Sequence, residues 1–109
     1  MGYYDKEALL KLVAEYYSLT PEEIKSPRRD MEVAKARHVA VYLLRKEFSL
    51  SYPAIGLFLG GRDHTTAMHS YRKINYFPDL RTMEEIAWIK NKFLENKNDS
   101  TRNNTGLAQ

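Results

Sequence analysis

Residues 51–66 read SYPAIGLFLGGRDHTT, a pattern that predicts two helices joined by a tight turn. The serine and proline at its start predict a short apolar helix, because serine caps helices and proline suits their first turn. The two adjacent glycines end that helix, since glycine adopts the positive φ that a sharp reversal requires. Asp63 is placed to cap a second helix that runs from His64 toward Tyr76. We therefore predict a helix-turn-helix.

Apolar residues at helical spacing predict further helices on both sides of this stretch. Their expected positions are residues 5–16, 20–25 and 31–48 before it and, after a break at 78–79, a last helix that opens at 82–85. The long third helix has an apolar stripe of Val33, Ala36, Ala40, Leu43 and Leu44. No strand pattern or internal repeat is visible, so we predict an all-α fold of about six helices around the helix-turn-helix. Residues 97–109 are mainly polar, which predicts a disordered tail after a single domain at 1–96.

The composition is that of an ordinary globular domain, with 43% hydrophobic, 28% charged and 12% aromatic residues. The 109 residues suffice for one hydrophobic core and are too few for two. The absence of cysteine excludes a disulfide framework, a thiolate zinc site and a cysteine nucleophile. No signal-peptide pattern is present, and no apolar run approaches the roughly 20 residues that span a bilayer. We therefore expect a cytoplasmic protein without a membrane span.

Charge is unevenly distributed along the chain, although its net value is only +3. Residues 27–73 contain nine Lys or Arg and four acidic residues, a net charge of +5, and the rest of the chain sums to −2. Within this block, residues 26–29 (Ser-Pro-Arg-Arg) predict an exposed basic loop, because proline disfavours helical torsions in the residue before it. The asymmetry points to a polyanionic partner. A solvated helix face rich in Lys and Arg is the alternative that charge alone leaves open.

The first turn of the second helix in the helix-turn-helix carries side chains suited to base edges. A recognition helix reads DNA with its N-terminal residues, so compact hydrogen-bonding side chains are expected there. Asp63 can accept from a cytosine amino group, and His64 can donate to or accept from a purine edge. Thr65 and Thr66 each offer a hydroxyl and a methyl group that packs on thymine. The alternative is that Asp63 and Thr66 only cap the helix while His64 is solvated.

The ordered signature GGRDHTT at residues 60–66, with RKI at 72–74 after it and SYPAIG at 51–56 before it, resembles the C-terminal DNA-binding domain (domain IV) of the DnaA family of bacterial chromosomal replication initiators. The resemblance covers about residues 5–96 and includes an arginine-rich loop before a long helix. It implies a TrpR-like helical domain that binds double-stranded DNA. The implied targets are asymmetric DnaA boxes of the TTATNCACA type, each bound by a monomer at the nucleoid, in origin recognition and replication initiation or its regulation.

The resemblance also implies which residues contact which part of the DNA. Arg29 would reach into the minor groove of an A·T-rich element, where a narrow groove concentrates negative potential. The adjacent major groove would be read by Asp63, His64, Thr65 and Thr66. Contacts to phosphates and sugars, which position the domain without specifying sequence, would come from Arg28, Arg37, His38, Arg45, Pro53, Arg62 and Lys73.

Several positions depart from the family pattern. The family often has a basic residue where this chain has Pro27 and a glutamine where it has His38, and here Asp30 and Glu32 place negative charge beside the minor-groove arginine. Each change weakens the attraction for phosphate, so we expect a lower affinity or an altered preferred box. Ser70 stands where an alanine is usual, and we expect its hydroxyl to bond back to the preceding turn of its helix.

We expect neither catalytic activity nor a cofactor. No glycine begins a Gly-x-x-x-x-Gly-Lys-Ser/Thr phosphate loop, and no nucleophile, base and orienting group stand together in the sequence. His64 and His69 are five residues apart with no carboxylate at ligand spacing, which argues against a metal site.

The sequence leaves open the setting in which this chain acts. An excised DNA-binding domain of an initiator and a stand-alone regulator built from the same domain both fit it. A third interpretation is an adaptor that contacts other replication-initiation proteins and has weak or no box-specific binding. It is motivated by Pro27, Asp30 and Glu32, which reduce the positive charge of the loop that should be most basic.

Overall fold

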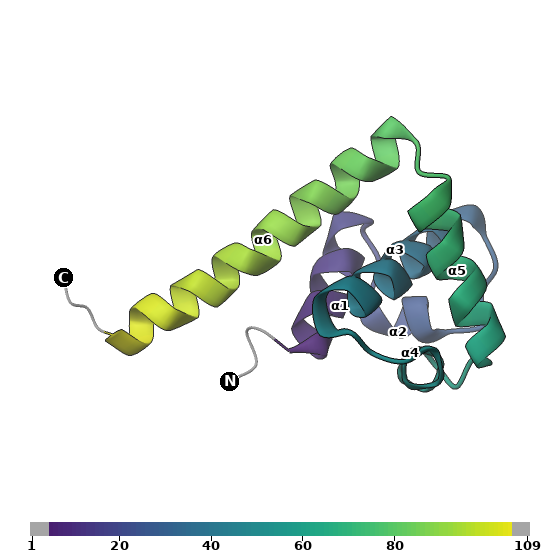
Figure 1. The fold of residues 1–109 in the computed structure, drawn as a ribbon, viewed down its shortest axis with the longest axis horizontal. Helices are drawn as coiled ribbons and strands as arrows, with labels where there is room; N and C mark the ends of the chain where they lie inside the picture. The colour runs from purple at the N-terminus through teal and green to yellow at the C-terminus, as the bar shows by residue number, and fades with distance from the viewer. Residues whose placement is uncertain (1–4, 106–109) are drawn as a thin grey trace.

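The computed structural model of the chain describes the backbone of residues 5–105 and the side chains of residues 5–96. Its helices in chain order are α1 (Lys6–Tyr16), α2 (Pro21–Lys25), α3 (Met31–Phe48), α4 (Tyr52–Phe58), α5 (His64–Tyr76) and α6 (Leu80–Thr105). Within the described residues every regular element is a helix, which confirms the predicted all-α fold. The first five helices pack together, and α6 crosses one side of this group and continues away from it (Figure 1).

Side-chain caps explain where the helices begin. Thr20 and Glu23 form the reciprocal capping box of α2: Thr20 Oγ1 accepts from the Glu23 backbone N–H at 3.1 Å, and Glu23 Oε1 accepts from the Thr20 backbone N–H at 2.9 Å. At α5, Asp63 Oδ2 accepts from the backbone N–H of Thr65 at 3.0 Å. These oxygens satisfy N–H groups that have no partner inside the helix. The caps confirm the predicted starts of both helices.

The helix α3 forms the centre of the fold, since all five other helices pack against it. Its buried face contains the predicted apolar stripe and two additional valines: Val33, Ala36, Val39, Ala40, Val41, Leu43 and Leu44. Most of this face shares one hydrophobic core with Leu9 and Val13 of α1 and with Ile89 and Phe93 of α6. Burial of each large side chain contributes about 1.5–3 kcal/mol. The core therefore gives the surface elements a rigid support.

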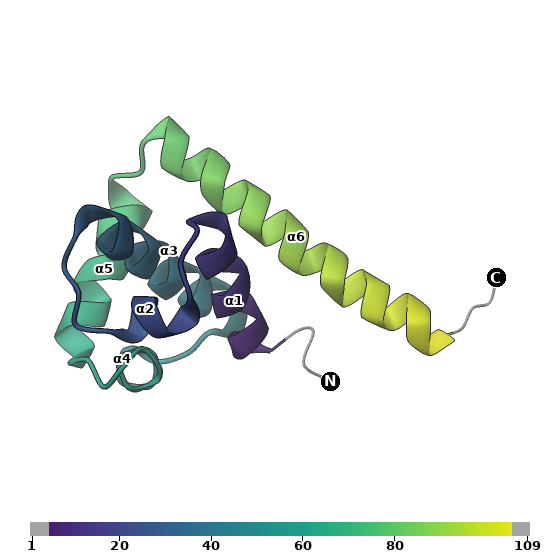
Figure 2. The same ribbon diagram turned by 180° about the vertical axis from the view of Figure 1, so that it is seen from behind.

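The predicted helix-turn-helix is present as α4, a glycine turn and α5. Gly60 and Gly61 have φ values of +93° and +78°, the left-handed region in which glycine avoids the strain of other residues. Both helices bury their apolar side, with Ile55 of α4 and Ala67 and Ile74 of α5 in the core. Figures 1 and 2 show that α4 and α5 lie on the side of the molecule away from the C-terminal half of α6. The end of α5 that begins at His64 is therefore open to solvent.

The helix α6 differs from the sequence expectation at both ends. It begins at Leu80 because Asp79 caps it, with Asp79 Oδ1 accepting from the Thr82 backbone N–H at 2.7 Å. It continues to Thr105, so residues 97–105, predicted to be disordered, are helical, and the expected domain boundary at residue 96 falls inside a helix. This segment contains no proline or glycine before Gly106, so nothing in it breaks a helix. Residues 106–109 of the expected tail lie outside the described range. Within that range, no helix combines the length and apolar character needed to cross a bilayer.

Candidate nucleic-acid interface

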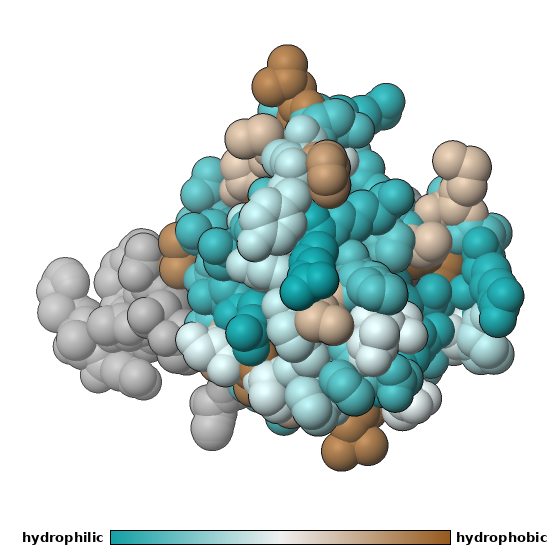
Figure 3. Space-filling view, turned by 45° about the vertical axis from the view of Figure 1, so that its right-hand side comes forward, coloured by the Kyte–Doolittle hydropathy of each residue, from teal (hydrophilic) through white to brown (hydrophobic). Residues whose placement is uncertain are grey.

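Six of the predicted site residues line a groove between the loop at residues 26–30, α3 and the start of α5. The groove has a volume of about 620 Å³, and its lining includes Arg28, Arg29, Arg37, His38, Arg62 and Thr66. Figure 3 brings the α5 side of the molecule forward and shows a mostly hydrophilic surface with a few scattered hydrophobic side chains. The structure thus joins the basic loop and the start of the second helix of the helix-turn-helix into one surface.

The base-reading candidates at the start of α5 are accessible. Asp63, His64 and Thr66 are exposed, and Thr65 is half-buried. Hydrogen bonds from Thr65, above all from its backbone N–H, lower the pKa of the Asp63 carboxyl below its usual value. His64 Nδ1 lies 3.8 Å from Asp63 Oδ1. Asp63 therefore acts as the helix cap, but the exposed side chains beside it remain free to contact a ligand.

The two adjacent loop arginines have different surroundings. Arg29 is exposed and makes no side-chain hydrogen bond or ion pair with the described part of the chain. Arg28 is held on both sides: its Nη1 lies 2.9 Å from Glu23 Oε2, and its Nε and Nη2 donate to the two Asp30 carboxylate oxygens at 3.0 and 3.1 Å. These bonds, chiefly the one to Asp30, raise the pKa of Arg28, and the bond to Arg28 lowers the pKa of Asp30. Among the described residues, Arg29 thus has no side-chain partner in this loop. A contact with the minor groove of DNA would require such an unpaired side chain.

Arg37 and Arg62, both predicted to contact DNA phosphates, line the groove and are hydrogen-bonded to the backbone. Arg37 is only 8% exposed, and its guanidinium donates to the backbone carbonyls of Ile24, Ser26 and Arg28 at 2.9, 2.8 and 3.1 Å. Arg62 is half-buried and donates to the carbonyls of Lys25 at 3.1 Å, Ser26 at 2.5 Å and Leu59. Burial lowers the pKa of both guanidinium groups, and for Arg37 the nearby charge of Arg62 adds to the effect. Most of their donors are therefore engaged within the protein.

His38 lies between α3 and α5 as a neutral group. Its Nδ1 is 2.9 Å from the Ser70 hydroxyl. Burial lowers its pKa below 6.5, and the positive charges of Lys73, Arg37 and Lys35 lower it further. Ser70 therefore bonds across to another helix, whereas we expected a bond to its own preceding turn. A neutral imidazole in the groove can offer one N–H to a phosphate but no net charge.

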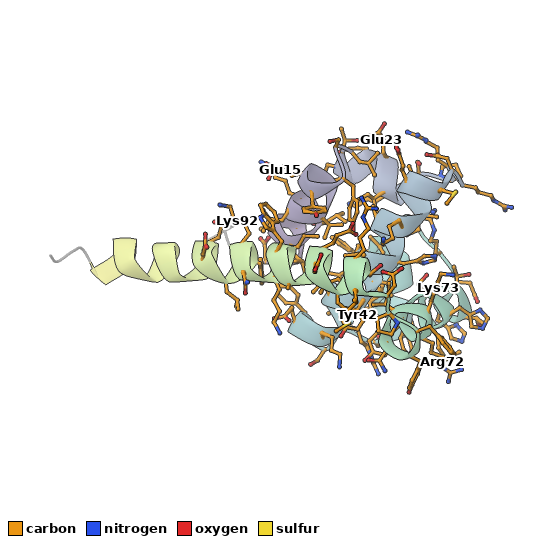
Figure 4. All side chains as sticks on the ribbon, turned by 90° about the horizontal axis from the view of Figure 1, so that it is seen from above. Glu15, Glu23, Tyr42, Arg72, Lys73 and Lys92 are labelled. Atoms are coloured by element: carbon orange, nitrogen blue, oxygen red, sulfur yellow. The ribbon has the colours of Figure 1, made fainter. Side chains whose placement is uncertain are left out.

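The remaining backbone candidates lie on α3, α4 and α5. Arg45 donates to the Leu50 carbonyl at 2.8 Å, and its guanidinium lies 4.3 Å from the centre of the Tyr52 ring. Pro53 is exposed in the first turn of α4. Lys73 is exposed on α5, and Figure 4 shows it and Arg72 on the side of the helical group away from Lys92. These residues extend the polar surface beyond the groove.

Sequence reasoning missed two parts of this surface. Lys25 lines the groove and its ammonium lies 4.7 Å from the centre of the Phe58 ring. The carbonyl groups at the end of α2 were also overlooked as the partners of two arginines. The available signal was that α2 is followed by Ser-Pro and not by a capping glycine, so its last carbonyls need other donors.

Among the described residues, no group of three or more His, Asp or Glu side chains is arranged to hold a metal ion.

Comparison of the sequence with known proteins identifies the family. The sequence model of the family described as bacterial dnaA protein helix-turn-helix matches residues 6–74. The chromosomal replication initiator protein DnaA of Gloeothece citriformis is 43% identical over 88 residues, which cover 79% of this chain and 19% of that protein. The initiator of Lactococcus lactis subsp. cremoris is 41% identical over 83 residues, covering 74% of this chain and 18% of that protein. The chain thus spans about a fifth of the length of these relatives.

Proposed function

This chain belongs to the bacterial DnaA helix-turn-helix family, and from that premise we propose that it binds double-stranded DNA sequence-specifically at DnaA boxes of the TTATNCACA type. In this proposal it serves origin recognition in replication initiation, or the regulation of that step, as a monomer on each box in the cytoplasm. It acts by binding, with no reaction of its own.

The observation that supports the proposal is that Arg29 and the start of α5, the two candidate readers, lie on one surface. Arg29 is exposed in the loop without a side-chain partner among the described residues, and the exposed start of α5 lies across the groove from it. An arginine suits a narrow A·T minor groove, and the small polar side chains at residues 63–66 suit base edges in the major groove. An asymmetric box with an A·T-rich end and a CACA end matches this pair of readers.

The contacts to phosphates and sugars would come from residues that are accessible around Arg29 and the start of α5. Lys73 and Pro53 are accessible for phosphates and sugars, Arg45 is partly accessible, and His38 can supply one N–H. Arg28 can reach a phosphate only by leaving its two carboxylate partners, which is feasible because exposed ion pairs are weak. The net charge of +5 over residues 27–73 attracts the DNA backbone in general.

The test is a titration of a labelled box duplex and a scrambled duplex of the same composition at about 150 mM salt. We expect the box to bind at least about tenfold more tightly, since each correctly read base pair contributes about 1–3 kcal/mol. Replacing Arg29 or His64 by alanine should weaken box binding by about 1–3 kcal/mol and flatten the preference. Lys92→Ala, on α6 and remote from the groove, is the matched control and should leave both affinities unchanged.

A second candidate function is the adaptor that contacts other replication-initiation proteins. The observation that favours it is the capture of Arg28 by Glu23 and Asp30, which reduces the free positive charge of the loop. Equal binding to box and scrambled duplexes, or no binding to either, would exclude box reading and leave this adaptor function.

A further inference from the structure

Two arginines from different elements converge on the same short segment of backbone. Arg37 comes from α3, and Arg62 comes from the turn between α4 and α5. Both donate to the carbonyl of Ser26, Arg37 through Nη2 at 2.8 Å and Arg62 through Nη2 at 2.5 Å. Arg37 also reaches Ile24 and Arg28, and Arg62 also reaches Lys25. One segment of five residues, 24–28, thus receives five side-chain hydrogen bonds from two guanidinium groups.

The carbonyls of Ile24 and Lys25 belong to the last turn of α2, and that of Ser26 to its C-cap. A helix leaves its last carbonyl groups without intrahelical partners, and cations are favourable there because the dipole is negative at that end. The side chains of the buried Arg37 and the half-buried Arg62 take the place of the usual capping glycine. The two arginines carry like charges, and the carbonyl oxygens that accept from the two guanidinium groups offset their repulsion.

The glycine turn also approaches the backbone at the end of α2, directly before the loop. A Cβ added at Gly60 would lie 2.2 Å from the carbonyl oxygen of Lys25, so only glycine permits this approach. Arg62 is next to Asp63, at the start of the base-reading turn, and Ser26 is three residues before Arg29. The hydrogen bond between Arg62 and Ser26 therefore links the start of α5, one residue from Arg62, to the loop that carries Arg29, three residues from Ser26.

We propose that Arg37 and Arg62 are positioning residues, which fix the loop that carries Arg29 relative to the start of α5 and do not act through phosphate contacts. This inference rests on the proposed function. The spacing between the minor-groove arginine and the major-groove reader is then set before DNA arrives. Without the two arginines the loop must be ordered on binding, which lowers the contribution of Arg29 while leaving α5 able to read its half of the box.

The first test needs no DNA. Trypsin cleaves after Lys25, Arg28 and Arg29 only when the segment opens locally. Arg62→Lys and Arg37→Lys keep the charge but lose the fork that reaches several carbonyls together. We expect cleavage in this loop to become at least about tenfold faster in either variant, with helix content by circular dichroism retained. Lys73→Ala is the control and should cleave like the parent chain. Arg37 is buried, so Arg37→Lys can fail to fold. Arg62 is only half-buried, and the Arg62→Lys variant then decides the test. Unchanged loop cleavage in Arg62→Lys would overturn the proposal.

The second test measures coupling between Arg62 and Arg29 on the box duplex. In the parent chain Arg29→Ala should weaken binding about 5- to 150-fold, and in the Arg62→Lys background by less than about threefold. Arg62→Gln should leave the slope of log affinity against log salt unchanged. A phosphate contact would instead reduce that slope by about one unit and keep the Arg29 effect intact, which would refute positioning. If the parent chain shows no box preference, the proposed function fails, and the trypsin result still decides whether the two arginines hold the loop.

Discussion

Alanine at Gly60 tests the contact between the turn and the loop most severely, and Gly61→Ala is its matched control. Both glycines have positive φ, +93° and +78°. A Cβ at Gly60 would meet the Lys25 carbonyl oxygen at 2.2 Å and Arg62 Nη1 at 3.0 Å, whereas a Cβ at Gly61 would meet nothing within 4 Å. The two variants therefore share the backbone strain and differ in the steric clash.

The expected magnitudes follow from these distances. Alanine in a left-handed conformation costs about 1–2 kcal/mol of folding free energy, which is the whole expected effect at Gly61. At Gly60 the carbonyl of Lys25 must also move, and its hydrogen bond from the charged Arg62 contributes about 1.5–3 kcal/mol. We therefore expect a loss of about 3–5 kcal/mol for Gly60→Ala. The difference of about 2 kcal/mol corresponds to a melting temperature lower by about 8–16 °C.

The assay is urea unfolding of the parent chain and both variants, followed by circular dichroism, with thermal melting as a second measurement. Box binding is then measured well below the melting temperature. Gly60→Ala should also reduce the penalty of Arg29→Ala, because the displaced loop no longer presents that arginine. Equal destabilisation by the two alanines would refute the close approach of the turn to Lys25 at the end of α2. It would also refute the inference that this contact holds the Arg29 loop and the start of α5 in a fixed arrangement.

Four further predictions concern charge and hydrogen bonding. Lys73→Ala should weaken box and scrambled duplexes alike and reduce the salt slope by about one unit; a selective loss on the box would assign it to base reading. Arg45→Ala should do the same in binding but also lower the unfolding midpoint, because its bond to the α3–α4 connection is lost. His38 has a pKa below 6.5 in the folded state, so the unfolded chain binds a proton that the folded chain does not, and stability should fall as the pH drops below about 6.5. His38→Gln should make that decline shallower in urea titrations across the range, and an unchanged decline would contradict this assignment. Burial and the 2.7 Å bond to Glu85 raise the pKa of Tyr17 above its usual 10.0, so stability present below pH 10.0 should be lost at higher pH. Tyr17→Phe should cost about 1.5–3 kcal/mol at neutral pH and remove part of the alkaline loss, as unfolding curves at both pH values would show.

The helices could be predicted from the sequence because their signals are local. Thr20 with Glu23, Ser51 with a following proline, and Asp63 after two glycines each place a helix start within four residues of chain. The apolar stripe of α3 repeats at the helical period, so its buried face was also evident. The start of α5 as a candidate reader followed from the same local pattern.

The start of α6 depended on a distant contact. Both Asp79 and Thr82 suit a helix cap, and the pattern from Thr82 to Glu85 resembles a capping box. Glu85 is instead 9% exposed, accepts a hydrogen bond from Tyr17 at 2.7 Å and pairs with Lys35 at 3.2 Å. Tyr17 and Lys35 lie far away along the chain, so no local pattern could reveal these contacts of Glu85.

The roles of the arginines were also beyond local reasoning. A long guanidinium side chain on a basic segment suggests phosphate contact, and the sequence does not distinguish Arg29, which projects freely, from Arg37, which is buried. The difference arises because the end of α2 needs donors and α3 places Arg37 beside it. Charge composition indicated the basic surface, whereas packing determines which of its cations are exposed and which are bonded to the backbone.

The central claim, that one rigid surface reads an asymmetric site in two grooves, is tested most directly by selecting bound sequences from a pool of random duplexes at about 150 mM salt. We predict enrichment of a single TTATNCACA-type element, and we predict that the Arg29→Ala protein retains the CACA end and loses the preference at the A·T-rich end. Selection of no common sequence, or of a two-fold symmetric site that Arg29→Ala leaves unchanged, would contradict the account.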